Sequence, residues 1–292
     1  MTDELAFIAA LRRIAHHPAA RDLADDCAVL EIGGEALVLT HDAMAEGVHY
    51  LADQDPADVA WKLVASNMSD LAAKGAEPLG VLLGHVLGAG DTQFLEGLEA
   101  ALSHYGAPLL GGDTIAATGP RVLGLTALGR ATHRPVPSRA GAQVGDGLWI
   151  TGPVGAAMLG LEALRAGTGN SLAYRRPQAL LAEGRALAPY VSAMIDVSDG
   201  LLLDAARIAR ASGVTLAIDA SAVPLAAPEA RRAEALRWGE DYQLLFTAPP
   251  GIVPPVAAWR IGEALAAGDS PILLDGACLR EADGLGYRHN QG

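Results

Sequence analysis

Residues 55–78 read DPADVAWKLVASNMSDLAAKGAEP, a helix pattern with clear start and stop signals. Asp55 is a good N-cap residue and Pro56 suits the first helical position. The pattern therefore predicts a helix from Pro56 to about Gly75, ended by the Glu77-Pro78 pair.

The predicted helix carries polar residues on the side that should be buried. Its apolar stripe is formed by Ala60, Leu63, Val64 and Leu71. At 100° per residue, Asn67 falls within this stripe, and Asp70 and Lys74 lie along one edge of it. A polar set thus interrupts a buried face, which is unusual for a helix that only packs.

Strand and helix patterns alternate on both sides of this helix. In the first half we expect strands at 36–40, 108–110 and 122–128, a short extended piece at 47–50, a helix at 92–105 and a loop at 111–114. In the second half we expect strands at 147–151, 193–197, 214–218 and 244–247, and helices at 156–166 and 201–212, the last capped by Ser198 or Asp199. The turn at 152–155 could bind an anion at the following helix, but a purely structural turn is favoured.

Length and composition agree with an α/β (or α+β) protein of about two domains. The chain has 292 residues, of which 51% are hydrophobic and 4% aromatic. Residues 133–146 have the proline and glycine content of a linker, so we divide the chain into domains 1–132 and 133–292.

The charge and the cysteine content exclude several classes of partner. A formal net charge of −13 disfavours nucleic acid. Cys27 and Cys278 offer no metal motif and suit a reducing compartment. We expect no signal peptide and no membrane span, and therefore a cytoplasmic protein.

The most informative feature is a set of acids at the ends of regular elements, seldom beside an obvious cationic partner. They are Asp25, Asp26, Asp42, Asp70, Asp113, Asp196, Asp199 and Glu240. Each alone reads as a cap, a turn former or a solvated residue. If several converge, each pair repels by roughly 4 kcal/mol at 4 Å and an effective dielectric of 20, so the group needs cations. Short acidic side chains suit Mg²⁺, and magnesium-assisted phosphoryl transfer follows. A P-loop and the protein-kinase motifs are absent from the sequence.

Taken in order, these segments resemble the thiamine-monophosphate kinase family, within the superfamily that includes aminoimidazole ribonucleotide synthetase and selenophosphate synthetase. The matching stretches are DDCAVL at 25–30, THD at 40–42, EGVH at 46–49, NMSDLAA at 67–73, GAEP at 75–78, GGDT at 111–114, SRAG at 138–141, IDVSDGL at 195–201 and GEDY at 239–242. The resemblance implies a two-domain aminoimidazole ribonucleotide synthetase-like fold. It also implies a homodimer in which the N-terminal domains pair into a shared barrel.

The resemblance assigns roles to individual residues. It implies Mg²⁺ binding by Asp26, Asp42, Asp70, Asp113 and Asp196, with Thr40 and Ser198 helping and Asp199 holding a further ion. Asp42, Asp113 and Asp199 form the implied catalytic set. Arg139, Gly112, Asp113 and Ser198 would bind ATP, and His49 and Glu240 would face thiamine monophosphate.

The implied chemistry agrees with the residue types. The attacking atom is an oxygen of a phosphate monoester, which is already anionic at pH 7, so a general base is not required. Catalysis then reduces to alignment and charge neutralisation, and a site rich in metal-binding acids suffices.

Three departures from the family pattern affect the site. His41 replaces the usual Thr or Ser before Asp42, so a hydroxyl ligand is either replaced by imidazole or lost. Trp238 replaces the first glycine of the usual Gly-Gly-Glu-Asp. Asn290 stands where the family has a closing aromatic, so Trp238 or Tyr287 is expected to stack on the acceptor, with simple packing of Trp238 as the alternative.

Two other functions stay open at this point. The chain could be another ATP-dependent enzyme of the superfamily that acts on a different phosphorylated small molecule. It could also be a nucleotide-binding relative that has lost catalysis, although the main acids are all present. A lone histidine more often only packs, but the position of His49 within the EGVH motif favours a functional role.

Overall fold

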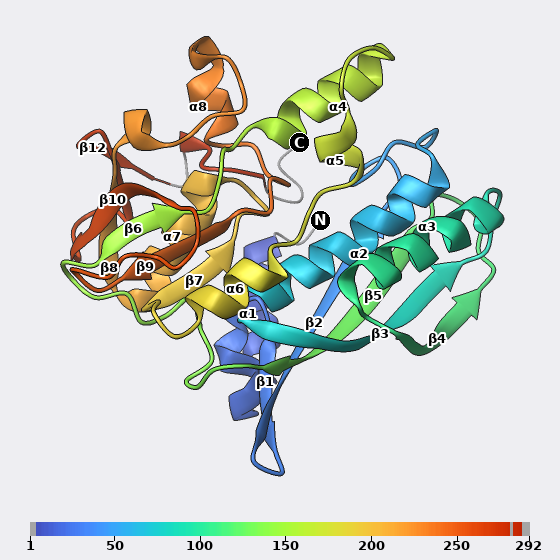
Figure 1. The fold of residues 1–292 in the computed structure, drawn as a ribbon, viewed down its shortest axis with the longest axis horizontal. Helices are drawn as coiled ribbons and strands as arrows, with labels where there is room; N and C mark the ends of the chain where they lie inside the picture. The colour runs from blue at the N-terminus through green and yellow to red at the C-terminus, as the bar shows by residue number, and fades with distance from the viewer. Residues whose placement is uncertain (1–3, 281–282, 288–292) are drawn as a thin grey trace.

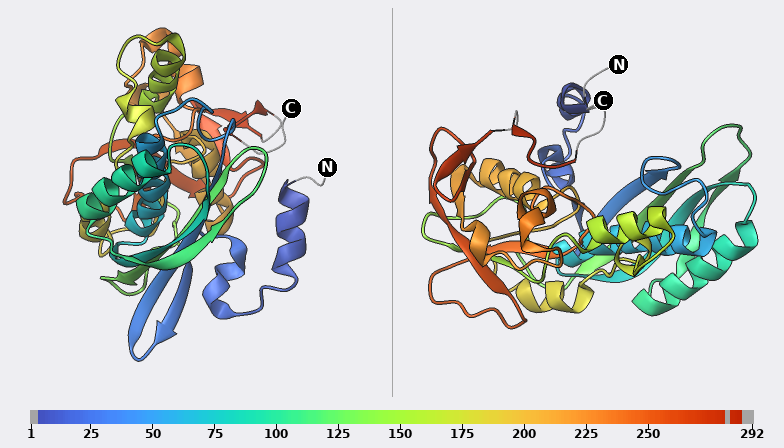
Figure 2. Two further views of the ribbon diagram at one scale, coloured as in Figure 1. Left: turned by 90° about the vertical axis from the view of Figure 1, so that its right-hand side faces the viewer. Right: turned by 90° about the horizontal axis from the view of Figure 1, so that it is seen from above.

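Two mixed β-sheets lie side by side, and a buried helix that packs on the first sheet reaches an edge strand of the second (Figure 1). The computed structural model describes residues 4–280 and 283–287. Helix α1 (Glu4–Arg12) contacts the short helix η1 (Pro18–Leu23) and stands to one side of the body (Figure 2). Among the described residues, no helix combines the length and the apolarity that a bilayer span requires.

The first sheet has the strand order β1-β2-β5-β3-β4. Its strands are β1 (Ala28–Ile32), β2 (Glu35–Ala45), β3 (Ala76–Val86), β4 (Leu109–Ile115) and β5 (Val122–Ala131). All neighbours are antiparallel except β3 and β4, which α3 (Asp91–Tyr105) connects as a parallel crossover. Strand β4 is therefore an edge strand, and every residue in it is exposed.

The second sheet has the order β12-β11-β8-β10-β6-β9-β7. Its strands are β6 (Gly147–Ile150), β7 (Ala193–Asp196), β8 (Val214–Ile218), β9 (Leu244–Ala248), β10 (Trp259–Ala266), β11 (Ile272–Leu274) and β12 (Ala277–Leu279). The other helices of this half are α4 (Ala156–Ala166), α5 (Leu172–Arg175), α6 (Leu181–Leu187), α7 (Leu201–Ser212), α8 (Arg232–Ala235), η2 (Ala220–Ala222) and η3 (Glu229–Arg231). Helix α7 packs on this sheet and contributes its apolar side to a second core.

Helix α2 (Pro56–Ala73) holds the two sheets together. Asp55 caps it by accepting a hydrogen bond from the Ala57 N–H at 2.9 Å, as the sequence predicted. All but three of its 18 residues are buried, because it packs against α3, the first sheet, α6 and β7. The first core continues through it to Met194 and Phe246 of the second sheet. The predicted apolar stripe was too narrow, since a helix enclosed on all sides buries its whole circumference.

Three local predictions in the first half were wrong. Strand β2 continues to Ala45, so Asp42 lies inside it rather than just beyond it. Residues 47–49 form a turn, closed by the bond from the His49 N–H to the Ala45 carbonyl at 3.0 Å, and Tyr50 makes an isolated bridge with Glu46. The predicted loop 111–114 is part of β4, and β3 was not predicted at all.

The glycines of β4 explain why residues 111–114 were predicted as a loop. Gly112 has a φ of +155°, and a Cβ there would lie 2.0 Å from the carbonyl oxygen of Leu83 in β3. Only glycine allows the two backbones to come this close. Glycine marks a close strand contact at this position, and not a turn.

Candidate active site

Three acids from three separate elements converge between the sheets. Asp26 precedes β1, Asp70 lies on α2, and Asp196 ends β7. One carboxylate oxygen of each lies within 4.8 Å of the others, which is a spacing that one metal ion could bridge. We call this set the acid cluster.

Helix α2 orients the acid cluster through its own polar residues. The Ser69 hydroxyl donates to Asp196 Oδ2 at 2.6 Å. The Thr40 hydroxyl of β2 donates to Asp70 Oδ2. The other oxygen of Asp196, Oδ1, is buried and has no hydrogen-bond partner among the described residues. An unpartnered buried carboxylate oxygen in a residue that lies beside two other acids is suited to a cation.

Strand β2 directs Asp42 and Thr40 to the same side, because alternate residues of a strand share a face. The Asp42 N–H donates to Asn67 Oδ1 at 3.1 Å, so a residue of the predicted stripe on α2 holds the strand. His41 points to the opposite face, where its Nδ1 lies 2.9 Å from the Thr126 hydroxyl. The structure therefore places Asp42 and Thr40 on the α2 side, and does not bring the His41 ring there.

The acids of this region raise one another's pKa. Burial raises the pKa of Asp70 well above its usual value, and the charges of Asp42 and Asp196 raise it further. Burial and the charge of Asp26 raise the pKa of Asp196 to about 8. Burial also raises the pKa of Asp42, with Asp199 adding to it. A divalent cation among these oxygens would offset the negative charge of the carboxylates and so relieve their repulsion. An all-oxygen donor set is the one that Mg²⁺ prefers. The residues present thus fit the metal that the sequence predicted.

Two cations border the acid cluster at Asp26. The Lys74 ammonium lies 2.6 Å from Asp26 Oδ2, and the Arg139 guanidinium donates from Nε to Asp26 Oδ1 at 2.9 Å. Burial alone would raise the pKa of Asp26, but Arg139 and Lys74 more than offset it, and the pKa is lowered. Lys74 also pairs with Asp25. The ion pairs of Lys74 with these acids were not predicted from the sequence, although the sequence places Lys74 along the edge of the predicted stripe of α2.

Asp199 and Ser198 lie in the turn that leads from β7 into α7. Asp199 Oδ2 lies 2.6 Å from Arg207. The predicted capping of α7 by Ser198 or Asp199 was wrong: the cap residue is Gly200, which offers no side chain. Instead, the buried Asp204 carboxylate accepts from the Asp199 N–H at 3.0 Å.

The second half supplies the other acceptor candidates. Glu240 has a φ of +66°, its N–H donates to the Ser198 carbonyl at 2.8 Å, and its side chain is 24% exposed. Tyr287 donates from its N–H to the Asp199 carbonyl at 2.8 Å, and its side chain is exposed. Trp238 is partly buried and packs against the second core. Asn290 lies outside the described residues.

His49 stands in the turn after β2. Its Nδ1 accepts from the Ala45 N–H at 3.0 Å, so the neutral ring carries its proton on Nε2. This bond fixes the ring relative to the strand that carries Asp42.

Asp113 and Gly112 stand apart from the acid cluster. They lie on the exposed edge strand β4, where Asp113 Oδ1 accepts from the Thr114 N–H at 2.9 Å. Within the described chain, the acid cluster comprises Asp26, Asp70 and Asp196 and does not include Asp113.

The turn before α4 is closed by the protein itself. Asp241 accepts from the Gly155 N–H at 2.6 Å and from the Ala157 N–H at 3.0 Å. A side-chain carboxylate thus occupies the helix N-terminus, in agreement with the structural reading of this turn.

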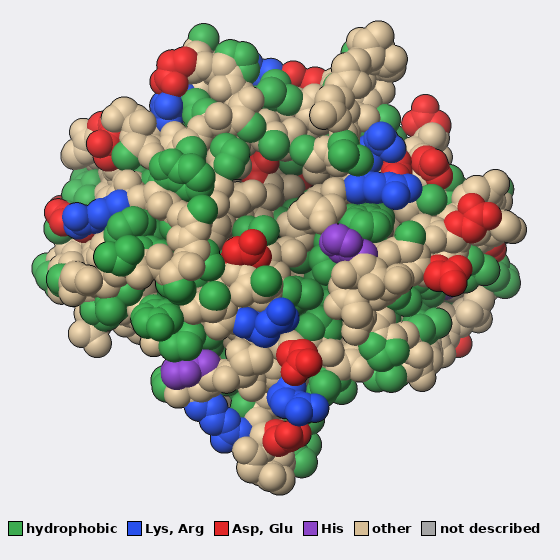
Figure 3. All heavy atoms as spheres, in the orientation of Figure 1, with side chains coloured by type: hydrophobic (Ala, Val, Ile, Leu, Met, Phe, Trp, Pro, Cys, Tyr) green, Lys and Arg blue, Asp and Glu red, His purple; other side chains and the backbone are tan. Residues whose placement is uncertain are grey.

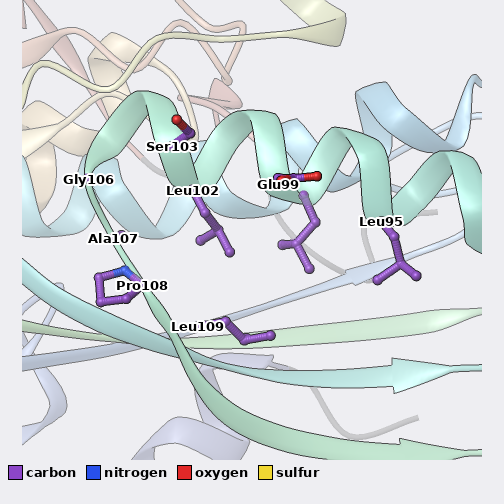
Figure 4. A pocket seen from close by; sticks show the side chains of 9 residues that line it. Leu95, Glu99, Leu102, Ser103, Gly106, Ala107, Pro108 and Leu109 are labelled. Carbon is purple, nitrogen blue, oxygen red and sulfur yellow. The ribbon is translucent and has the colours of Figure 1, made fainter.

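One surface pocket lies away from the candidate site residues. Between α3 and the start of β4 lies a pocket of about 620 Å³, with four leucines among its nine lining residues and none of the candidate residues (Figure 4). On the face drawn in Figure 3, acidic and basic side chains are interspersed, without an extended basic patch.

Comparison with known proteins agrees with this geometry. Residues 24–131 match the family model "AIR synthase related protein, N-terminal domain", and residues 143–270 match the corresponding C-terminal domain. Thiamine-monophosphate kinase of Caulobacter vibrioides is 37% identical over 274 residues, which cover 86% of this chain and 76% of that protein. The enzyme of Escherichia coli K12 is 36% identical over 251 residues, covering 78% of this chain and 76% of that protein.

Solved structures show the same relationship. AaThiL complexed with AMPPCP and TMP has a TM-score of 0.87 at 27% identity, covering 98% of this chain and 97% of that one. The Stenotrophomonas maltophilia thiamine-monophosphate kinase has a TM-score of 0.76 at 30% identity, covering 94% and 96%. The fold is therefore the two-domain α/β fold of the AIR synthase-related proteins. The chain belongs to the thiamine-monophosphate kinase family.

Proposed function

We propose that this protein transfers the γ-phosphoryl group of ATP to thiamine monophosphate and so forms thiamine diphosphate. The observation that carries the proposal is the acid cluster between the two halves of a chain that is 37% identical to a thiamine-monophosphate kinase. AaThiL, which has the same fold, is complexed with AMPPCP and TMP, and this supports ATP and thiamine monophosphate as the substrates.

The proposal gives the acids a metal-binding role. Mg²⁺ ions would be held by the acid cluster together with Asp42 and Asp199, with Thr40 as a further ligand. When bound, the ions would neutralise negative charge on the ATP phosphates and on the transferred group. Asp113 would join them from β4, and His41 would contribute at most its backbone, since its ring points to the other face.

The remaining residues would bind and orient the substrates. Arg139, with Gly112 and Ser198, would contact ATP, since Arg139 already borders the acid cluster at Asp26. His49 and Glu240 would hold the acceptor, with Trp238 or Tyr287 stacked on its rings. The attacking phosphate oxygen is anionic at pH 7, so these residues need only align it and exclude water.

The proposal includes a homodimer formed through the first sheet. Strand β4 is an unpaired edge, and Leu109, Leu110 and Ile115 on it are half exposed. An exposed apolar edge of this kind favours a protein partner, and a second copy is the one that the family resemblance implies. Light scattering after size exclusion would give about 60 kDa for the dimer, against the 30.0 kDa of one chain.

The proposal also covers the domain boundary and the cellular location of the protein. We place the domains at 1–132 and 133–292, because β5 ends at Ala131 and β6 begins at Gly147. A reducing, cytoplasmic location suits the two unpaired cysteines, Cys27 and Cys278.

The test is direct conversion with purified protein. Thiamine monophosphate, ATP and Mg²⁺ are incubated with the protein, and the thiamine phosphates are separated by chromatography. Formation of thiamine diphosphate that needs both ATP and Mg²⁺ supports the proposal. Hydrolysis of ATP without this product, at any acceptor concentration, would overturn it.

A further inference from the structure

Lys62 is a buried cation that the chemistry proposed above does not use. It lies on α2, and its side chain is 1% exposed. Burial lowers its pKa, and the negative charge of Glu240 opposes that shift. An ammonium removed from water is strongly destabilising unless partners replace its hydration, so its contacts indicate its role.

The Lys62 ammonium meets three groups from three different segments. It lies 2.6 Å from Glu240 Oε1, donates to the His49 carbonyl at 2.8 Å, and lies 3.7 Å from the centre of the Tyr174 ring. These contacts match the three N–H donors of a lysine. The Tyr174 hydroxyl donates to the same His49 carbonyl at 3.1 Å. One cation thus connects the His49 turn, α5 and the Glu240 loop.

The loop that carries Glu240 needs such support. Glu240 and Tyr242 have φ values of +66° and +50°, a region of backbone conformation that is strained for residues other than glycine. The Asp241 side chain fixes the loop to the start of α4. Lys62 holds one oxygen of Glu240, while the remaining exposure of the side chain leaves it accessible to a ligand.

We propose that Lys62 is a positioning residue of the acceptor site, whose ammonium holds the Glu240 carboxylate and the His49 turn in the arrangement that receives thiamine monophosphate. This inference rests on the proposed function, because Lys62 would position residues of the acceptor site proposed there.

The competing role is that of a structural tie between the two halves of the chain. Asp58, one turn earlier on α2, has that kind of contact: it is buried and pairs with Arg175 and Arg176 at the C-terminal end of α5. In an Arg176→Gln variant, Arg175 still pairs with Asp58, so one interdomain ion pair is lost while α5 stays attached. This variant is the matched control for Lys62.

The experiment compares Lys62→Met, Glu240→Gln, their double variant and Arg176→Gln with the wild type. For each we measure kcat, KM for thiamine monophosphate, KM for ATP, the melting temperature and, without ATP, thiamine monophosphate binding by calorimetry. Lys62→Gln is made in parallel, because it keeps N–H donors and folds more readily if the methionine variant does not.

The positioning role predicts an acceptor-selective defect. Lys62→Met should raise KM and the dissociation constant for thiamine monophosphate about tenfold, since bonds to charged groups are of that strength, while KM for ATP changes less than about twofold. KM for thiamine monophosphate in the double variant should exceed that of the weaker-binding single variant by no more than about twofold, because Lys62 acts through Glu240. Arg176→Gln should lower the melting temperature without changing KM for thiamine monophosphate.

Other outcomes separate the two proposals. A wild-type KM for thiamine monophosphate in Lys62→Met, equal losses for both substrates, or full multiplication of the defects in the double variant would overturn the role of Lys62. A wild-type protein that forms no thiamine diphosphate would instead overturn the proposed function.

Discussion

Replacing Asp196 by Asn should stabilise the metal-free protein and remove its stabilisation by Mg²⁺. The asparagine can keep the bond from Ser69, since its Oδ1 replaces Asp196 Oδ2 as the acceptor. It removes the charge that lies within 4.8 Å of Asp26 and Asp70. Two unit charges at that separation repel by about 3 kcal/mol at an effective dielectric of 20.

The pH dependence follows from the raised pKa of Asp196. Its pKa is 3.8 in the unfolded chain and about 8 in the folded one, so the unfolded state gives up its proton first as the pH rises. Metal-free wild type therefore loses stability between about pH 4 and pH 8, and this loss is fully present above pH 8. The asparagine variant lacks this titrating group and should lose less stability over the same pH range.

Differential scanning calorimetry at pH 5 and pH 8, with and without Mg²⁺, measures both effects. At pH 8 without metal, the variant should unfold roughly 6 °C above the wild type, from about 3 kcal/mol and about 2 °C per kcal/mol for a protein of this size. The difference should shrink at pH 5. Asp146→Asn is the control, since Asp146 is buried but binds the Gln143 N–H outside the acid cluster. If Mg²⁺ raises the melting temperature of both proteins equally, or if the variant is less stable at pH 8, the metal assignment is refuted.

Four further substitutions test the assigned roles in steady-state assays of thiamine diphosphate formation. Asp42→Asn and Asp113→Asn should each abolish turnover while the protein stays folded by circular dichroism; near-normal turnover of either at saturating Mg²⁺ would contradict its place among the metal ligands. His49→Ala should raise KM for thiamine monophosphate more than KM for ATP, whereas equal losses would assign His49 to holding the turn through Ala45. Trp238→Ala should raise KM for thiamine monophosphate about three- to tenfold with little change in melting temperature if the ring stacks on the acceptor. Lower stability without that selective defect would show that Trp238 only packs against the second core.

Helix α2 shows what the sequence could predict and where the prediction stopped. The Asp55 cap and Pro56 were sufficient to place its start, because these signals are local. The burial of Lys62 was not predicted, because a lysine on a helix usually faces water. Apolar residues on every side of α2 were the available signal, since a helix of that kind is enclosed and its cations must be paired.

The acid motifs identified the metal candidates, but not their arrangement. Asp26, Asp70 and Asp196 meet because β7 docks on α2, and their separations of 44 and 126 residues leave no local pattern of contact. Side-chain partners such as Ser69 with Asp196 depend on the same docking. The start of β4 was predicted, but its continuation through residues 111–114 was predicted as a loop, because the glycines there serve a close approach to β3.

Transfer of a phosphoryl group from ATP to thiamine monophosphate can be measured from the product balance of one reaction. The purified protein is incubated with Mg²⁺, ATP labelled in the γ-phosphoryl group and thiamine monophosphate, and the products are separated and identified by mass spectrometry. We expect ADP and thiamine diphosphate in a one-to-one ratio, with the label in the terminal phosphate of thiamine diphosphate. Label recovered as inorganic phosphate, or on a different acceptor supplied in the same mixture, would contradict it.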